Sequence, residues 1–165
     1  MKPIIIPFKT NSLGRIMFNT GILAGDYKST KDVEFKFDSG SDFTTIHWDV
    51  LTEVLEFSEK FLDDCPFHHD PASAAGTKDI PLQYITNMSM KFGDRELQGV
   101  RIFFAKNTEM RSLLGSDVLK YFNWDVNYDK GIFQLAERET KPLLSKGEER
   151  PIEIYSLENL IQLKS

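Results

Sequence analysis

The residues best suited to chemistry in this sequence are Asp38-Ser39-Gly40-Ser41. In the segment before them, residues 33–37, apolar and charged side chains alternate, which predicts a strand with one apolar face. The alternation stops at Asp38, and Gly40 can turn the chain there through a positive φ. A carboxylate at the exit of a buried strand is costly unless it is hydrogen-bonded. Asp38 therefore needs either a structural partner or a chemical task.

Peptide hydrolysis is a task that suits a carboxylate in this position. Without a metal or a covalent intermediate, a water must lose a proton as it attacks, and the leaving nitrogen must gain one. Two carboxyl groups that share one proton can do both. The tripeptide Asp-Ser-Gly occurs once in the sequence. A twofold-symmetric homodimer that brings two Asp38 side chains to within about 3 Å is then the simple solution, because like charges that close cannot both ionise.

A second element lies much further along the chain, at Leu113-Leu114-Gly115, and precedes a short helical pattern at 116–122 and a strand pattern at 124–129. In this order and at this spacing, the two elements resemble the signatures of the retropepsin-like aspartic proteases. The resemblance covers roughly residues 31–135. It implies an all-β fold, a retropepsin-like closed barrel of short strands with one or two short helices. It also implies a homodimeric aspartic endopeptidase that hydrolyses peptide segments bound in extended form.

The resemblance gives each residue of the motif a role. Asp38 supplies the catalytic carboxyl group. Ser39 takes the place of the family's hydroxyl that hydrogen-bonds across the dyad to the partner chain's backbone, and Gly40 lets backbone approach the carboxylate. Ser41 departs from the alanine usual in viral members and matches the pepsin-like form. We expect its hydroxyl to donate to the outer carboxylate oxygen of Asp38, which would favour the charged form.

Alternating apolar residues predict further strands at 3–8, 15–23, 44–46, 88–92, 97–104 and 131–135. The prolines in the first of these strands confine it to the edge of a sheet.

Two helices are expected from the apolar spacing. The first covers 49–61 with Asp49 as its N-cap, and the second begins at Ser116 as N-cap. The segment 63–76 reads as a loop, and the family has a β-hairpin flap that closes over the substrate in this region, which we place at about 68–82.

The chain divides by composition into three parts. We expect residues 1–136 to form the protease domain, 137–150 a charged linker, and 151–165 a C-terminal tail of unknown role.

The composition excludes several classes of function. The net charge is −5 and no block of Lys or Arg occurs, which argues against nucleic acid or an anionic membrane as the main partner. Cys65 is the single cysteine, so no intrachain disulfide can form. The apolar run near the N-terminus is too short for a signal peptide, and no segment reaches membrane-spanning length. A cytoplasmic protein that needs no cofactor is the expectation.

Several alternatives stay open on the sequence alone. The motif at Asp38 can be an ordinary Asx-type turn, and the chain can be a retropepsin-like dimerisation or peptide-binding module without activity. The loop from Cys65 to Asp70 contains metal-capable side chains, but a zinc site needs spaced pairs that converge from ordered elements. Asp117 suits the first turn of a helix, and His47 suits a packed or rim position.

Overall fold

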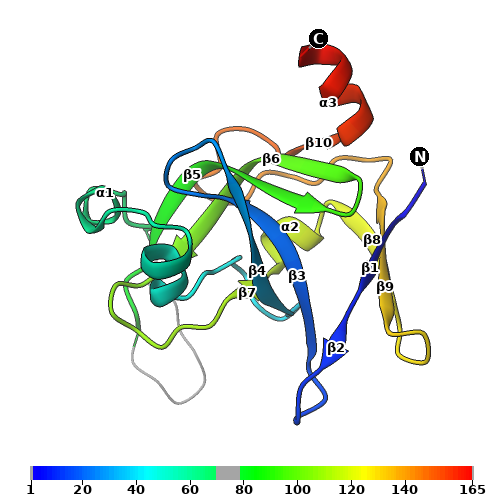
Figure 1. The fold of residues 1–165 in the computed structure, drawn as a ribbon, viewed down its shortest axis with the longest axis horizontal. Helices are drawn as coiled ribbons and strands as arrows, with labels where there is room; N and C mark the ends of the chain where they lie inside the picture. Colours follow the sequence, from blue (N-terminus) through cyan, green and yellow to red (C-terminus); the bar gives the residue numbers. More distant parts are fainter. Residues whose placement is uncertain (1, 70–78, 165) are drawn as a thin grey trace.

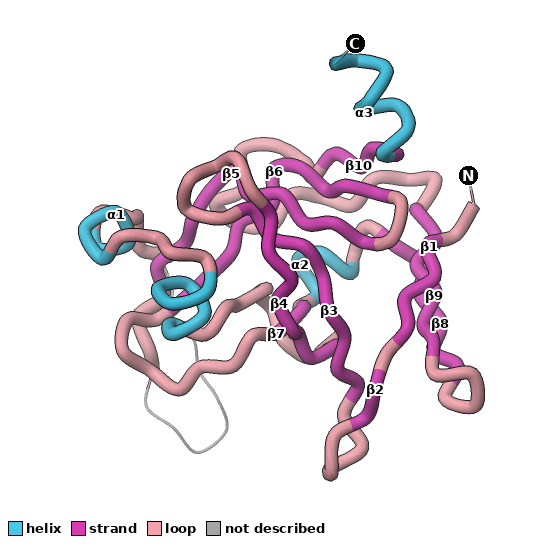
Figure 2. The backbone as a smooth tube through the Cα atoms, in the orientation of Figure 1, coloured by secondary structure: helices cyan, strands magenta, loops and turns pink. Residues whose placement is uncertain are grey.

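The computed structural model describes residues 2–69 and 79–164. The described strands form two sheets, in which all strand pairings but one are antiparallel, and the helices are short (Figures 1 and 2). The larger sheet has the strand order β10-β6-β5-β3-β4-β7, and β2 pairs with β3. Its strands are β2 (Lys9–Thr10), β3 (Ile16–Leu23), β4 (Thr30–Phe37), β5 (Gln83–Phe92), β6 (Arg95–Phe104), β7 (Leu113–Leu114) and β10 (Glu153–Ser156).

The extended segment 44–46 closes the larger sheet into a barrel. On one side Thr45 N donates to Leu113 O of β7 at 2.9 Å, and Leu113 N returns a hydrogen bond to Thr45 O at 3.0 Å. On the other side the same segment pairs with Phe103 of β6, through Phe103 N to Thr44 O and Ile46 N to Phe103 O, each at 2.9 Å. The expected retropepsin-like barrel is therefore confirmed, but residues 44–46 join it through isolated bridges at Thr45 and do not form the expected strand.

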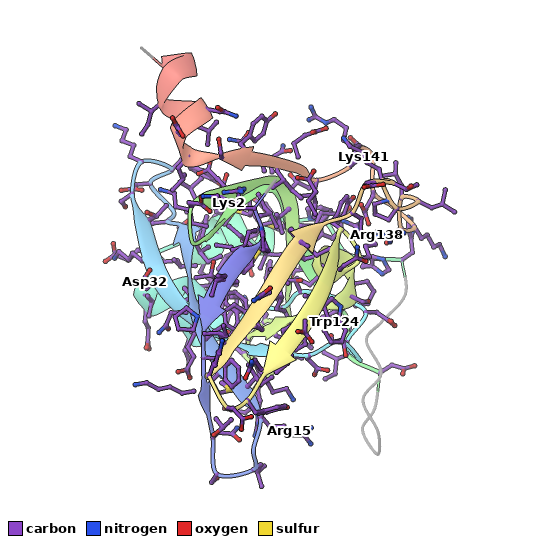
Figure 3. All side chains as sticks on the ribbon, turned by 90° about the vertical axis from the view of Figure 1, so that its right-hand side faces the viewer. Lys2, Arg15, Asp32, Trp124, Arg138 and Lys141 are labelled. Atoms are coloured by element: carbon purple, nitrogen blue, oxygen red, sulfur yellow. The ribbon has the colours of Figure 1, made fainter. Side chains whose placement is uncertain are left out.

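The smaller sheet has the order β1-β9-β8 and covers one side of the barrel (Figure 3). Its strands are β1 (Ile4–Pro7), β8 (Phe122–Asn127) and β9 (Ile132–Glu137). The inward side chains of this sheet meet the barrel core, because Phe133 lies 5.1 Å from Phe18 and 5.2 Å from Phe37 between ring centroids. Trp124 of β8 packs edge-on against Phe37 at 5.1 Å. The sheet is thus joined to the strand that leads into Asp38.

The strand predictions agree with the structure because each pattern lies on an element with one buried face. β5 and β6 form the hairpin expected around Gly93, which has a positive φ of 54°. β8 and β9 form the second expected hairpin, and β1 lies at a sheet edge as its prolines require.

The helix expected over 49–61 is wrong. The structure has a single π-helical turn, η1 (Val50–Val54), and a separate short helix, α1 (Glu59–Asp63). Leu55 N bonds to Val50 O, and Glu56 then takes a positive φ of 59°, which ends the turn. Asp49 makes no capping hydrogen bond, whereas Ser58 caps α1 by accepting from Phe61 N at 3.1 Å.

The remaining helices are α2 (Ser116–Leu119) and α3 (Leu157–Lys164). The N-cap of α2 is Gly115 and not Ser116, so the expected boundary was one residue late. In the tail, β10 pairs with β6, and α3 then extends away from the barrel (Figure 1). None of the helices in residues 2–69 and 79–164 is long and apolar enough to cross a membrane.

Candidate active site

Asp38 lies at the point where β4 leaves the barrel. Its backbone N–H donates to Leu114 O at 3.0 Å, so the structure brings the two sequence elements together as expected. The side chain is partly exposed, at 28%. Carboxylate oxygen Oδ1 accepts from Gly40 N at 3.2 Å, and Oδ2 lies 3.4 Å from the ammonium of Lys36. The carboxylate is therefore held by its own turn and by one cation, and it remains open to solvent.

Gly40 leaves space beside this carboxylate. A Cβ built on Gly40 would lie 3.5 Å from Asp38 Oδ1, and no other atom would come within 4 Å. The expected positive φ is wrong, since Gly40 is not among the described glycines with positive φ. Ser39 next to it is exposed, and its hydroxyl makes no hydrogen bond with the described part of the chain.

Ser41 does not donate to the carboxylate of Asp38, which corrects the expectation from the motif. Its Oγ donates instead to Phe43 O, two residues later, at 2.8 Å. Serine hydroxyls in turns commonly bond to nearby backbone in this way. The backbone of Ser41 is also fixed, because its N–H donates to Asp38 O and its carbonyl accepts from Ser116 N at 2.7 Å. Ser41 thus stabilises the conformation of the loop. Its hydroxyl makes no hydrogen bond to the carboxylate of Asp38.

The loop that follows Asp38 is fastened to the start of α2. Asp117 Oδ1 accepts from the hydroxyl of Thr44 at 2.6 Å, and Oδ2 accepts from Thr44 N at 3.0 Å. Thr44 Oγ1 in turn accepts from Gly115 N at 3.1 Å. A Cβ at Gly115 would collide with Phe43 O and would lie 2.9 Å from Ser41 O. Glycine is required at this position because two backbone segments meet there.

Asp117 is a buried acid with a perturbed pKa. Burial raises the pKa of its carboxyl group from 3.8 to about 6, although the hydrogen bonds from Thr44 and Val118 and the nearby charge of Arg101 act in the opposite direction. The expectation that Asp117 serves in the first turn of a helix is confirmed, but its main contacts are with Thr44. Sequence reasoning missed Thr44, since nothing in the local pattern shows that it faces a residue 73 positions later.

The two ends of the segment expected to form the flap pair with each other. Phe67 and Gln83 form an antiparallel bridge, with His68 N donating to Leu82 O at 2.7 Å and Tyr84 N donating to Pro66 O at 3.1 Å. These contacts bring the two ends of the segment 68–82 together as the arms of a hairpin. The middle of the segment, residues 70–78, lies outside the described residues.

The alternative metal loop can be examined up to His69. Within the described ranges, no group of three His, Cys, Asp or Glu side chains is placed to hold a metal ion. Cys65 is buried, which raises the pKa of its thiol, and Asp70 lies outside the described residues.

No protein-family model matches this sequence, and no curated protein matches it. Among solved structures, the chain is similar to a crystal structure of a retropepsin-like aspartic protease from Rickettsia conorii. The two share 19% sequence identity with a TM-score of 0.55, over 81% of this chain and 90% of that chain. The fold is retropepsin-like. This agrees with the barrel closed by residues 44–46 and with Asp38 at the end of a barrel strand.

In this retropepsin-like fold, sequence reasoning left out two cationic residues that line a pocket, and one of them, Lys36, lies 3.4 Å from Asp38 Oδ2. Lys36, His47 and Arg111 line a shallow pocket of about 270 Å³ together with Met17, Glu34 and Ser112. Lys36 could have been found from the sequence, because strand residues two apart share a face and Lys36 precedes Asp38 by two. Arg111 could not, since the parallel pairing of β4 with β7 brings it there.

A larger cavity, of about 580 Å³, lies away from the motif, between the β5–β6 hairpin and residues 147–155. Asp117 and Arg101 line it, and its lining includes neither Asp38 to Ser41 nor Lys36, which pairs with Asp38. It is therefore separate from the candidate active site, although Asp117 contacts both regions.

Proposed function

We propose that this chain is an aspartic endopeptidase that hydrolyses extended peptides with a water activated between the Asp38 carboxyl groups of two chains. The observation that carries the proposal is the partly exposed Asp38 carboxylate at the exit of a barrel strand, held by a hydrogen bond from Gly40 N. Its backbone is bonded to Leu114, so the second element supports it. Two such carboxylates with one shared proton supply both the base and the acid for amide hydrolysis.

The dimer follows from the chemistry of a single motif. One chain supplies one Asp-Ser-Gly, and the exposed hydroxyl of Ser39 has no hydrogen-bond partner in the described part of its own chain. A second chain would provide both the second carboxyl and backbone acceptors for Ser39. The partner and the substrate of this proposal are therefore another copy of the chain and a peptide or protein segment, with no cofactor.

The test is cleavage of a peptide library by the wild-type protein and by Asp38→Asn. The substitution retains size and an acceptor for Gly40 N, and it removes the ion pair with Lys36 and the shared-proton chemistry. We expect cleavage by the wild type and none by the variant, with unchanged circular dichroism. Full activity in the variant would refute the mechanism.

A second candidate is a peptide-binding or dimerisation module without activity. The ion pair between Lys36 and Asp38 favours it, because a cation on the same chain already engages the carboxylate. Binding of peptides without cleavage by the wild type would establish this candidate over the first.

A further inference from the structure

We propose that the pocket lined by Lys36, His47 and Arg111, which adjoins Asp38 through Lys36, selects an acidic side chain of the substrate, with Arg111 as the residue that determines this preference. The inference rests on the proposed function and names its substrate class. It starts from one face of β4, on which Glu34, Lys36 and Asp38 follow each other at every second position.

Of the three residues on this face of β4, Lys36 connects the pocket to the catalytic carboxyl group of Asp38. Lys36 lines the pocket, and its ammonium lies 3.4 Å from Asp38 Oδ2. Same-face positions of an extended strand are about 7 Å apart, which is also the spacing of same-face side chains in an extended peptide. A peptide that runs along this face of β4 with its scissile bond at Asp38 would place a neighbouring side chain within reach of this pocket.

Arg111 supplies the charge that is available to a ligand. Lys36 is engaged by Asp38, whereas the exposed side chain of Arg111 has no ion-pair or hydrogen-bond partner among residues 2–69 and 79–164. A guanidinium presents paired donors that match a carboxylate, so Arg111 suits glutamate or aspartate.

The backbone around Arg111 is fixed, which keeps the pocket formed before a substrate arrives. Arg111 O accepts from Thr45 Oγ1 at 2.6 Å, and Ser112 O accepts from Lys36 N at 3.0 Å. Ser112 Oγ also accepts from His47 N at 3.0 Å. A preorganised site loses less entropy when a ligand binds.

The other charged groups at the pocket, His47 and Glu34, do not prevent an acidic side chain from binding to Arg111. His47 is engaged by acids of its own chain, with Nε2 3.5 Å from Glu109 and Nδ1 3.9 Å from Asp49. Glu34 is exposed and lies two positions further from Asp38 than Lys36 does. The end of the pocket nearest the reacting group is thus cationic, and an acid there complements it.

The experiment compares peptides that differ only by Glu or Gln at each position around the cleavage site. We expect Glu to raise kcat/KM by about tenfold at one position, the size of one partly solvated charge pair, and the preference to shrink in high salt. Arg111→Gln should remove the preference, and Arg111→Glu should reverse it. Glu34→Gln should strengthen it. The control is Lys28→Glu, which changes the charge by the same amount as Arg111→Glu but lies in the turn at the other end of β4. This variant should retain the preference for Glu.

Binding of the same peptides to Asp38→Asn, measured by fluorescence anisotropy, separates this inference from the proposed function. If no peptide is cleaved but the Glu peptide binds better than the Gln peptide, and Arg111→Glu abolishes this difference, the protease proposal fails and the pocket assignment stands. If peptides are cleaved with no preference for Glu, or Arg111→Glu retains that preference, the pocket assignment is overturned. Absence of both cleavage and binding overturns both proposals.

Discussion

The titration of Asp117 makes the stability of this fold depend on pH in a way that can be worked out from the structure. The folded carboxyl group has a pKa of about 6 against an ordinary value of 3.8, because it is buried. The raised pKa means that the folded state binds this proton more tightly than the unfolded state does. The stabilisation is therefore fully present below about pH 4 and is lost as the pH rises through 6.

The expected magnitude follows from the difference in pKa. A shift of about two units corresponds to about 3 kcal/mol of unfolding free energy, at 1.36 kcal/mol for each unit. Because other acids titrate over the same range, the quantity to measure is the difference between the wild type and Asp117→Asn. The variant cannot titrate at this position. Relative to it, the wild type should lose about 3 kcal/mol between pH 4 and 7.

Urea unfolding at fixed protein concentration, from pH 4 to 7.5, measures this difference. The changed hydrogen bonds to Thr44 in the variant add an offset that does not depend on pH. Asp32→Asn serves as a control, since Asp32 is exposed on β4 and the substitution removes one carboxylate without disturbing a buried network. A flat difference between the wild type and Asp117→Asn, or one that grows with pH, would refute the reasoning.

Substitutions at three positions test the loop around Asp38. Thr44→Val removes the donor to Asp117 and the acceptor for Gly115 N, both buried, so urea unfolding should show a loss of about 3 kcal/mol, and Thr44→Ser should restore most of it. Gly115→Ala places a Cβ against two backbone carbonyls, and we expect urea unfolding to show a loss on the order of 2 kcal/mol or above. Ser41→Ala should cost about 1 kcal/mol and leave the pH dependence of kcat/KM unmoved, because the hydroxyl of Ser41 bonds to Phe43 O; an acidic limb displaced upward in pH would show instead that the hydroxyl acts on the carboxylate.

The elements that could be predicted from the sequence are those whose local pattern agrees with their burial. The β5–β6 hairpin has buried side chains at alternate positions on both sides of Gly93, so the period of two was visible. The segment 49–61 has the apolar content of a helix, but its path depends on contacts with distant residues. Gly25 N donates to Leu55 O at 2.8 Å, and no pattern within the segment encodes that contact.

The contacts of the candidate site also differ in whether the local sequence predicts them. The Asp38 turn and its approach to Leu114 followed from two motifs, whereas the Asp117–Thr44 contact and the position of Arg111 depend on the barrel's long-range pairing. For Ser41, the sequence does not show which acceptor its hydroxyl bonds to. A hydroxyl beside a carboxylate has several acceptors within reach, and the choice between them depends on the exact course of the backbone, here on Phe43 O.

The most direct test of the central claim is the activity of wild-type chains mixed with increasing amounts of Asp38→Asn chains, after exchange of subunits. If each active site needs one Asp38 from each of two chains, heterodimers are inactive. At equal amounts of the two chains and random pairing, about a quarter of the dimers are then wild-type on both sides, so activity per wild-type chain should fall to about half. Activity per wild-type chain that stays constant at every mixing ratio, with exchange shown independently, would contradict the account.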